Sequence, residues 1–410
     1  MAASYYNSTV SKPAIPEDAP SGDDLTAHHV KDKHGETVKF HNPHPSFGET
    51  LRLTAFAMGR KMIWTRLMGD MKDPDVSAVK IPTVKPTFLS PEGPPPTALR
   101  ATWLGHACYF VEFPSGLRVL FDPVFEDRCS PVTWFGPRRY TPPPCAPADI
   151  PAIDAVVISH SHYDHLSHTS VSAIAARHPG AQFFVPLGLQ RWFRESGIER
   201  VTEMDWWEDA ELVLKAKAGG DAAAAAAAAA AEAKVQTRTP DSIAARVSCL
   251  PCQHSSGRTH NDRDHTLWAS WAVSSGGKSV WFGGDTGYRA VPRVAEGVDD
   301  YGPEYEALPR CPQFAQIGRL RGPFDLGLIP IGAYKPRWIM SGMHADPRDA
   351  VEIFKDTRCR QAMGIHWGTW VLTSEDVEEP PRKLMEALKK AGIPEKGVFD
   401  TCATGESREF

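Results

Sequence analysis

Short apolar runs separated by polar turns begin near Leu99 and set the pattern of the chain. The runs at 107–111 and 118–121 flank a Pro-Ser-Gly turn and predict a β-hairpin that ends at Asp122. A similar unit covers 267–273 and 279–282, with a Ser-Ser-Gly-Gly turn between its runs, and leads to Asp285. Two hairpins of like design, each ending in an aspartate, hint at an internal duplication.

Helical patterns alternate with the other apolar runs. The run at 155–158 precedes a helical pattern at 169–178, which Pro179-Gly180 ends. Strands are expected at 326–331 and 361–365, and helices at 346–355 and 381–391. Asp346 as N-cap and Pro347 at the first helical position specify one helix start. Two sheets with helices outside them satisfy this order, so we predict an α/β fold of the αββα sandwich class.

The segments outside this pattern suggest three divisions of the chain. Residues 1–45 are polar and Pro-rich and predict a disordered tail, and residues 46–98 predict an N-terminal helix followed by a Pro-rich connector. A capping box at 46–49 would start that helix. Its basic residues interleave with apolar ones and Trp64, which fits either docking on an anionic membrane surface or packing on the domain. Residues 99–410 form the main domain, with an Ala-rich surface insertion at 215–242.

Composition narrows the class of partner and compartment. The net charge of −5 and the pI of about 6.3 give no overall electrostatic footprint for nucleic acid. No apolar stretch reaches the roughly 20 residues that span a bilayer, and the first 20 residues resemble no secretory signal. Eight scattered cysteines then favour reduced thiols and an intracellular, cytoplasmic or peripheral membrane location, and a mitochondrial association stays open. We interpret Cys249 and Cys252 as structural, with a zinc knuckle or a redox pair as the alternatives.

The strongest chemical signal is the stretch His160-Ser161-His162-Tyr163-Asp164-His165. It follows the apolar run at 155–158, so it lies on a loop at the carboxyl end of a buried strand, where α/β folds place their chemistry. Three imidazoles and one carboxylate on a short loop repel one another when the imidazoles are charged. A metal cation is the natural partner of such a group.

Three further candidate ligands stand beside turn residues at expected strand ends: His254, Asp285 and His366. With the first motif they make seven groups, enough for two tetrahedral zinc ions that share a bridging carboxylate and a bridging water. Imidazole and carboxylate ligands suit zinc well, and manganese or iron remains an alternative. His106 fits either a partner that orients a metal-binding imidazole or an ordinary core histidine.

Longer strings of residues carry a family resemblance. They are Thr102-Trp103-Leu104-Gly105-His106-Ala107, Phe183-Phe184-Val185-Pro186-Leu187-Gly188, Asp205-Trp206-Trp207-Glu208, Gly284-Asp285-Thr286-Gly287-Tyr288, Pro330-Ile331-Gly332-Ala333-Tyr334-Lys335-Pro336-Arg337-Trp338, Ile365-His366-Trp367-Gly368-Thr369 and Gly405-Glu406-Ser407-Arg408. Together with the histidine motif, they resemble the N-acylphosphatidylethanolamine-hydrolysing phospholipase D family of the metallo-β-lactamase superfamily. The resemblance covers about 99–408, apart from the Ala-rich insertion.

The resemblance implies a role for each matching position. His160, His162 and His254 would hold one zinc ion, Asp164, His165 and His366 the other, and Asp285 would bridge them. Tyr163 and His344 match positions that contact the N-acylethanolamine part of the ligand, although an ordinary structural role fits them as well. The chain departs from the family pattern at Gly257 and at Thr133-Trp134, which puts amphiphile regulation and acyl preference in doubt.

The implied activity is zinc-dependent cleavage of N-acylphosphatidylethanolamine to N-acylethanolamine and phosphatidic acid. Asp164 and Asp285 would be catalytic, and either Asp164 or a metal-polarised water would protonate the leaving group. The resemblance also suggests a phospholipid substrate, contact with a peripheral membrane surface and a homodimer. The alternatives are a lactonase, thioesterase or other phosphodiesterase of the same fold, and a non-catalytic metal-binding scaffold. Net acidity argues against a nuclease.

Overall fold

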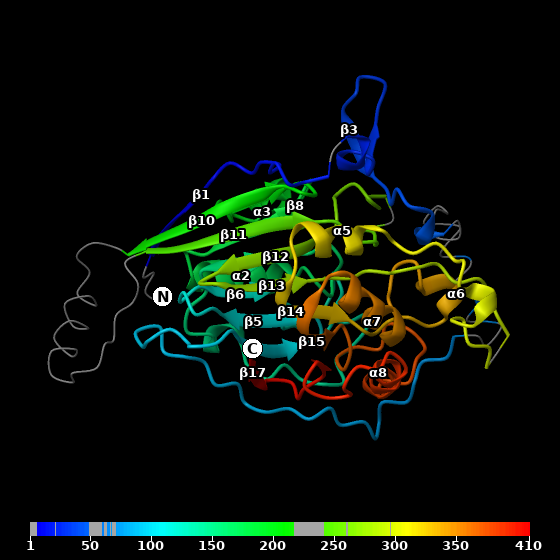
Figure 1. Ribbon diagram of the computed structural model, residues 1–410. Coiled ribbons are helices and arrows are strands. Elements are labelled where there is room, and N and C mark those ends of the chain that lie inside the picture. The colour runs from blue at the N-terminus through cyan, green and yellow to red at the C-terminus, as the bar shows by residue number, and fades with distance from the viewer. Residues whose placement is uncertain are drawn as a thin grey trace.

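The computed structural model describes residues 6–20, 22–48, 60, 64–65, 67, 71–216, 242–259, 261–295 and 297–410. Two large sheets dominate it (Figure 1). The eight-stranded sheet has the order β1 (Tyr6–Val10), β10 (Asp209–Ala216), β11 (Ser242–Leu250), β12 (Ser270–Ser275), β13 (Lys278–Phe282), β14 (Phe324–Pro330), β15 (Cys359–Ile365) and β16 (Phe399–Asp400). The seven-stranded sheet has the order β17 (Ser407–Glu409), β4 (Arg100–Gly105), β5 (Cys108–Glu112), β6 (Arg118–Phe121), β7 (Ala155–Val157), β8 (Gln182–Pro186) and β9 (Val201–Met204).

The other elements lie outside these two sheets. The α-helices are α2 (His168–Arg177), α3 (Gln190–Glu195), α5 (Gln313–Leu320), α6 (Arg337–Met340), α7 (Pro347–Asp356) and α8 (Glu379–Lys390). Within the described residues, the short 3-10 helices are η1 (Gly22–Leu25), η2 (Pro45–Phe47), η4 (Pro147–Asp149) and η5 (Pro303–Tyr305). A separate hairpin, β2 (His29–Lys31) with β3 (Thr37–Phe40), projects at the top of the view in Figure 1.

The two sheets pack face to face over one apolar core, and helices cover their outer faces. Phe121 at the end of β6 and Phe282 at the end of β13 meet across this core, with ring centroids 4.9 Å apart. A second cluster, which includes Val171 and Phe193, lies between the seven-stranded sheet and α2 and α3. Helix α7 packs on β14 and β15, and Figure 1 shows α5, α7 and α8 grouped beside these strands. The predicted αββα sandwich is confirmed.

The two predicted hairpins have the same topology. Strands β5 and β6 pair antiparallel, as do β12 and β13. In each hairpin the second strand also pairs in parallel with the next strand of the sheet, β6 with β7 and β13 with β14. Asp122 follows β6 directly, and Asp285 follows β13 after two glycines. The shared topology places both aspartates at the same edge of the sandwich. The predicted start of α7 is also confirmed, because the Asp346 carboxylate accepts hydrogen bonds from the backbone N–H groups of Arg348 and Asp349.

The N-terminal segment differs from the predicted disordered tail. Strand β1 pairs antiparallel with β10 and buries Tyr6, and the β2–β3 hairpin follows it. The edge of β10 offers unpaired backbone groups, and β1 satisfies them, which a composition argument could not foresee. Ser46 lies in η2 and is buried. Most of the expected helix after it falls in 49–70, outside the described residues apart from four positions, and the Ala-rich insertion falls almost wholly in the undescribed 217–241.

All eight cysteines are free thiols. Within the described residues, no helix is long and apolar enough to cross a bilayer.

Candidate metal centre

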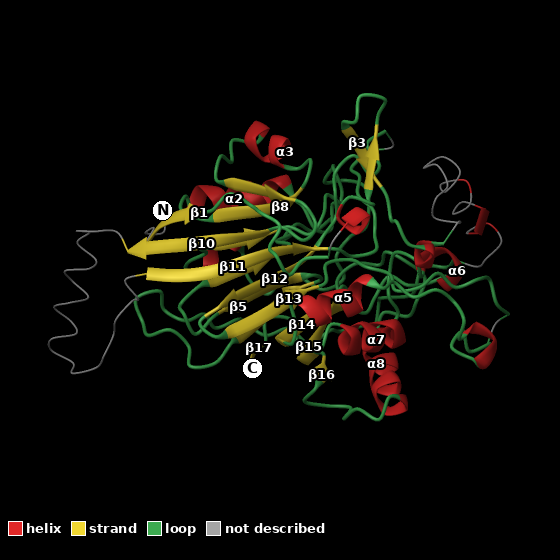
Figure 2. Cartoon of the chain, turned by 45° about the horizontal axis from the view of Figure 1, so that its top comes forward, coloured by secondary structure: helices red, strands yellow, loops and turns green. Residues whose placement is uncertain are grey.

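Loops at the carboxyl ends of strands from both sheets meet at one edge of the sandwich, and Figure 2 shows them gathered at the ends of the strands. The histidine motif follows β7, and His254 follows β11. Asp285 follows β13, and His366 comes directly after β15. The parallel pairing of β6 with β7 and of β13, β14 and β15 brings these ends together.

The first group that could hold a metal ion consists of His160, His162, His254 and Asp285. His162 Nδ1 lies 2.8 Å from His160 Nε2 and 3.2 Å from His254 Nε2. Asp285 Oδ2 lies 3.5 Å from His254 Nε2 and 3.9 Å from His160 Nε2. Three imidazole nitrogens and one carboxylate oxygen therefore converge, which is the ligand number and type of a tetrahedral zinc site.

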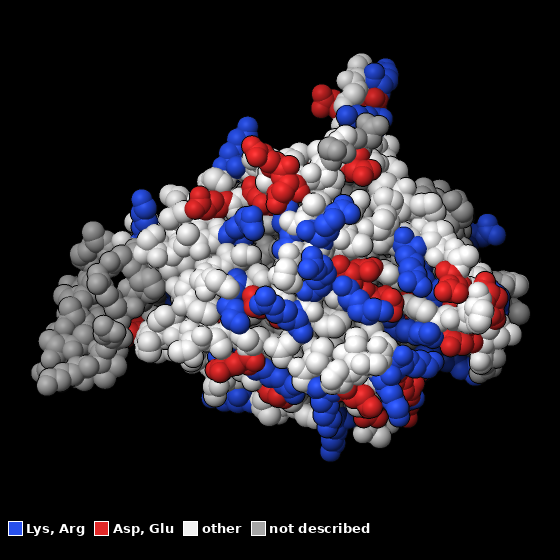
Figure 3. All heavy atoms as spheres, in the orientation of Figure 1, with Lys and Arg blue, Asp and Glu red and all other residues white. Residues whose placement is uncertain are grey.

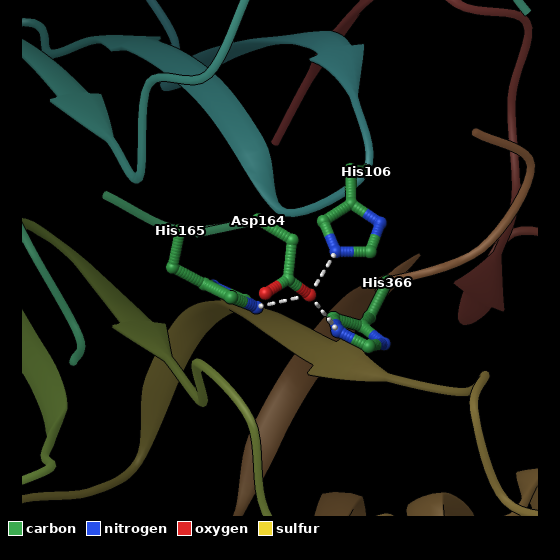
Figure 4. A group of neighbouring side chains, drawn as sticks. All are labelled: His106, Asp164, His165 and His366. Carbon is green, nitrogen blue, oxygen red and sulfur yellow. Dashed lines mark hydrogen bonds and ion pairs between the residues drawn. The ribbon is translucent and has the colours of Figure 1, made fainter. Parts of the chain in front are cut away.

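The second group is His106, Asp164, His165 and His366. Figure 4 shows their side chains turned toward one another, with Asp164 in the middle. Asp164 Oδ2 lies 3.1 Å from His106 Nε2, 3.4 Å from His165 Nε2 and 3.3 Å from His366 Nε2. These atoms come from the β4–β5 turn, the histidine motif and the end of β15, so residues about 260 positions apart in the chain share one carboxylate oxygen.

Asp285 connects the two groups. Its Oδ2 faces the first group, whereas its Oδ1 lies 3.2 Å from His165 Nε2 and 3.0 Å from His366 Nε2 in the second. A carboxylate with one oxygen directed at each of two adjacent ligand sets has the arrangement of a bridging ligand. Gly284 makes this placement possible, because a Cβ there would lie 2.6 Å from Cβ of Ser159, which starts the motif loop.

Hydrogen bonds to the far ring nitrogens fix the orientation of the imidazoles. His254 Nδ1 donates to the carbonyl oxygen of Met343 over 3.0 Å, which leaves Nε2 as the free lone pair directed at the first group. His165 Nδ1 donates to Asp122 Oδ2 over 2.7 Å and likewise presents Nε2 to the second group. Asp122 also accepts from the backbone N–H of Ser159 over 2.7 Å, so it holds both the loop and the ring.

Asp122 is a functional residue that the sequence argument missed. The available signal was its place at the end of the first hairpin, which matches the place of Asp285 after the second. Its role as an orienting residue depends on contacts with a loop 37 and 43 positions away, and no local pattern encodes them.

The backbone is strained at several of these positions. His106, Asp122 and His366 have φ angles of 53°, 38° and 63°, in the left-handed region that non-glycine residues rarely adopt. The backbone N–H of His366 donates to the carbonyl oxygen of His106 over 3.1 Å, and the N–H of His106 donates to Thr369 Oγ1 over 2.8 Å. These bonds hold both histidines in the strained conformation that aims their rings at Asp164.

Burial sets the protonation states in the first group. It holds the pKa values of His160 and His254 well below 6.5, and neighbouring imidazoles lower them further, so both rings are neutral at pH 7. Burial works to raise the pKa of Asp285, but the charges of His165 and His366 outweigh it and hold that pKa well below its usual value. Neutral imidazoles and an ionised carboxylate are the forms that ligate a metal. Burial works to lower the pKa values of His165 and His366, but the carboxylates of Asp285 and Asp164 outweigh it and raise both, and a bound cation would displace those protons.

The donor atoms fit a metal better than they fit one another. His165 Nε2 and Asp285 Oδ1 are buried and lie 3.2 Å apart, yet neither has a hydrogen-bond partner. Buried polar atoms without partners are costly and call for an explanation, and a cation between them supplies one. The structure thus brings all seven residues expected as ligands into two adjacent groups and adds His106 to the second.

Tyr163 and His344 flank the two groups in different ways. His344 is buried beside them, with its Nδ1 3.9 Å from Asp285 Oδ2 and its ring centroid 5.0 Å from that of His254. Burial lowers the pKa of His344 to about 4, so the ring is neutral. Tyr163 is half-buried beneath Arg258, whose guanidinium carbon lies 4.0 Å from the tyrosine ring centroid. Arg258 also donates to the carbonyl oxygens of Ser161 and Leu166, each over 2.8 Å, and so braces the motif loop.

Comparison with known proteins adds a family to this geometry. Residues 117–367 match the beta-lactamase superfamily domain. The N-acyl-phosphatidylethanolamine-hydrolyzing phospholipase D 1 of Caenorhabditis elegans is 38% identical over 316 residues, which cover 76% of this chain and 75% of the relative. A mitochondrial protein of Saccharomyces cerevisiae with the same activity in its name is 30% identical over 73% of this chain and 53% of its own length. A solved metallo hydrolase from Ignicoccus hospitalis aligns with 77% of this chain at a TM-score of 0.45 and 19% identity.

Proposed function

This chain belongs to the N-acylphosphatidylethanolamine-hydrolysing phospholipase D family of the metallo-β-lactamase superfamily, and we propose that it uses two zinc ions to cleave N-acylphosphatidylethanolamines. The products would be N-acylethanolamine and phosphatidic acid. The observation that carries the two-metal part is the Asp285 carboxylate, with Oδ2 toward one ligand group and Oδ1 toward the other. The substrate part rests on the names of the relatives from C. elegans and S. cerevisiae.

In this proposal His160, His162 and His254 hold one zinc ion, and Asp164, His165 and His366 hold the other, with Asp285 between them. When bound, such ions would supply a hydroxide at neutral pH, by lowering the pKa of water from about 15.7 to about 7, and would offset the negative charge of a phosphodiester. We assign zinc because a tetrahedral set of imidazole and carboxylate ligands suits it, and manganese or iron is the alternative for the same donors.

The protein's own groups hold this apparatus and move protons. Burial works to raise the pKa of Asp164, but the charge of His165 and the hydrogen bond from His106 hold it well below its usual value. Asp164 is therefore ionised at neutral pH and accepts a proton before it can return one to the leaving alkoxide. Burial lowers the pKa of His106 to about 3, so its Nε2 donates to Asp164 as a neutral imidazole and fixes the carboxylate.

Tyr163 and His344 would contact the N-acylethanolamine part of the substrate. Tyr163 lies in the histidine motif between His162 and Asp164, and His344 reaches Asp285 directly. Its buried Nδ1 has no hydrogen-bond partner, so it has a free position to offer a ligand. Asp285 and Asp164 would be the catalytic carboxylates.

Product analysis tests the proposed reaction. Purified, zinc-loaded protein incubated with N-acylphosphatidylethanolamine in ¹⁸O-labelled water should release unlabelled N-acylethanolamine and phosphatidic acid that carries the label, because attack at phosphorus leaves the new oxygen there. Mass spectrometry reads both products, and a chelator should stop the reaction. Parallel assays with a lactone, a thioester and a simple phosphodiester cover the other activities of this fold. Turnover of one of these without lipid cleavage would overturn the proposal.

We also propose that the protein docks on a membrane surface as a peripheral protein, through the region that includes Trp64 and Leu67. These side chains are 65% and 76% exposed. Figure 3 shows acidic and basic residues interspersed over one face of the molecule, without a field of a single sign. We further propose a homodimer, from the family resemblance, and a mitochondrial association, from the name of the S. cerevisiae relative.

Vesicle co-sedimentation tests the docking region. The double substitution Trp64→Ala/Leu67→Ala should reduce the fraction bound to phosphatidylcholine vesicles several-fold, because it removes apolar surface that would enter the lipid interface. Met385→Ala removes a side chain that is 40% exposed on α8 and should leave binding unchanged. Equal binding by the double variant and the original chain would place docking elsewhere. Truncating the N-terminus is a poorer test, since β1 and the segment near His254 would be lost with it.

A further inference from the structure

The N-terminal segment 28–48 reaches the loop that carries His254, more than 200 positions away in the chain. We refer to this segment as the strap. The loop at 251–256 lies beyond the end of β11, so no strand pairing fixes its backbone. The inference below rests on the proposed metal centre, in which His254 is a ligand.

Asn42 binds the backbone of His254 at both of its polar groups. The Asn42 side-chain NH₂ donates to the His254 carbonyl oxygen over 2.6 Å, and the His254 N–H donates to Asn42 Oδ1 over 3.1 Å. Asn42 is buried, so water does not compete for these bonds. Asparagine and glutamine alone offer a donor and an acceptor side by side, as this two-point contact needs.

The preceding residue of the loop, Gln253, is held by the same strap. Ser46 Oγ donates to Gln253 Oε1 over 2.5 Å, and Gln253 Nε2 donates to the carbonyl oxygens of Ser46 and Gly342 over 3.2 Å and 2.9 Å. The backbone N–H of Gln253 donates to Thr286 Oγ1 over 2.8 Å, next to Asp285. The loop of His254 is thus clamped between the strap and the loop of Asp285.

The far end of the strap is anchored to the domain. His28 Nε2 and His29 Nε2 each lie 2.8 Å from a different oxygen of Asp205, and the His28 ring stacks on Trp206 at 4.1 Å. Burial works to raise the pKa of Asp205, but hydrogen bonds from His28 and His29 outweigh it and lower the pKa to about 2. A carboxylate can only accept, so both imidazoles donate to it at neutral pH.

We propose that the strap positions a metal ligand, with Asn42 as the positioning residue for His254. Asn42 fixes the backbone of His254, and the Met343 carbonyl fixes its ring, so Nε2 is held toward His160, His162 and Asp285. Partners that orient a ligand in this way change metal affinity by about 10- to 100-fold when they are removed. The two hydrogen bonds of Asn42 hold a ligand of the first group, so the affinity of the second group should stay the same.

Zinc affinity measured against a graded series of chelators tests this inference without any lipid assay. In Asn42→Ala, one of the two zinc equivalents should bind about 10- to 100-fold more weakly, while the other keeps its original affinity. Asn7→Ala makes the same chemical change at an exposed position of β1 and should leave both affinities unaltered. If Asn42→Ala binds both ions as tightly as the original chain, Asn42 has no positioning role.

A second variant keeps the inference testable if Asn42→Ala does not fold. Ser46→Ala removes the hydroxyl contact to Gln253 and keeps Asn42, and it should weaken the same zinc equivalent several-fold. Unchanged zinc binding in Ser46→Ala would then overturn the strap. The outcome is separable from that of the proposed function, because a protein that binds two zinc ions and cleaves no lipid would refute the activity and leave the role of Asn42 intact.

Discussion

Asp285→Asn should lower the rate of lipid hydrolysis by about three orders of magnitude or more. The substitution keeps the size of the side chain but removes its charge and replaces one oxygen by an NH₂ group that cannot ligate a metal. Because Oδ1 and Oδ2 face different ligand groups, one substitution weakens the carboxylate contribution to both groups. Metal ions supply several kcal/mol of transition-state stabilisation, and each 1.36 kcal/mol is about tenfold in rate.

Steady-state assays of the purified variant, with its zinc content and thermal unfolding recorded beside them, measure this effect. The fold should persist, since Asp285 follows β13 and contributes nothing to the apolar core. Asp299→Asn makes the same change at a side chain that is 56% exposed and outside both ligand groups, and it should retain full activity. An Asp285→Asn enzyme that turns over normally with zinc bound would exclude a bridging role.

Trp271→Ala should lower the free energy of unfolding by about 3–5 kcal/mol, the usual cost of deleting a large buried aromatic side chain. Trp271 lies on β12 in the core between the two sheets and is fully buried. Its Nε1 also donates to the carbonyl oxygen of Ile158 over 3.0 Å, next to the histidine motif, and the substitution leaves that carbonyl without a partner. The whole domain is expected to be stable by about 5–15 kcal/mol, so this is a large fraction.

Urea unfolding of the metal-free protein, followed by far-UV circular dichroism, gives the comparison. Trp134→Ala is the matched control, because Trp134 is 78% exposed and its loss should change stability by no more than about 0.5 kcal/mol. A Trp271→Ala variant with the same urea midpoint and slope as the original chain would contradict the assignment of this residue to the core.

The sequence predicted most of the main domain because its patterns are local. Two apolar runs and the turn between them predict each hairpin, and an aspartate followed by a proline predicts the start of α7. Three tryptophans of the family-specific strings are fully buried: Trp103, Trp206 and Trp207. Trp338 and Trp367, in two other strings, are half-buried. Those strings therefore record how the two sheets pack, which is why they identify a family more sharply than the metal motif alone.

The features that sequence reasoning missed depend on contacts between distant segments. Asp122 orients His165 only because β6 and β7 lie side by side. His106 was expected near the site, but its place in the second group depends on a strained turn. The N-terminal segment has a composition typical of disorder, yet β1 completes an edge and Asn42 reaches His254. Whether such a segment is buried depends on the surfaces that other parts of the fold offer it. The segment's own sequence does not indicate those surfaces.

Strands β10 and β11 pair antiparallel, so the connection between them lies at the opposite end of β11 from His254. The amino-acid sequence at these two ends is under different constraints. His254 follows the last residue of β11, whereas residues 217–241 join the first residue of β11 to the last of β10, one strand length away. Insertions or substitutions in that connection should leave the geometry of the ligand groups unchanged, both in natural relatives and in engineered variants. A reporter domain or an affinity handle belongs there, at the end of the molecule remote from its chemistry.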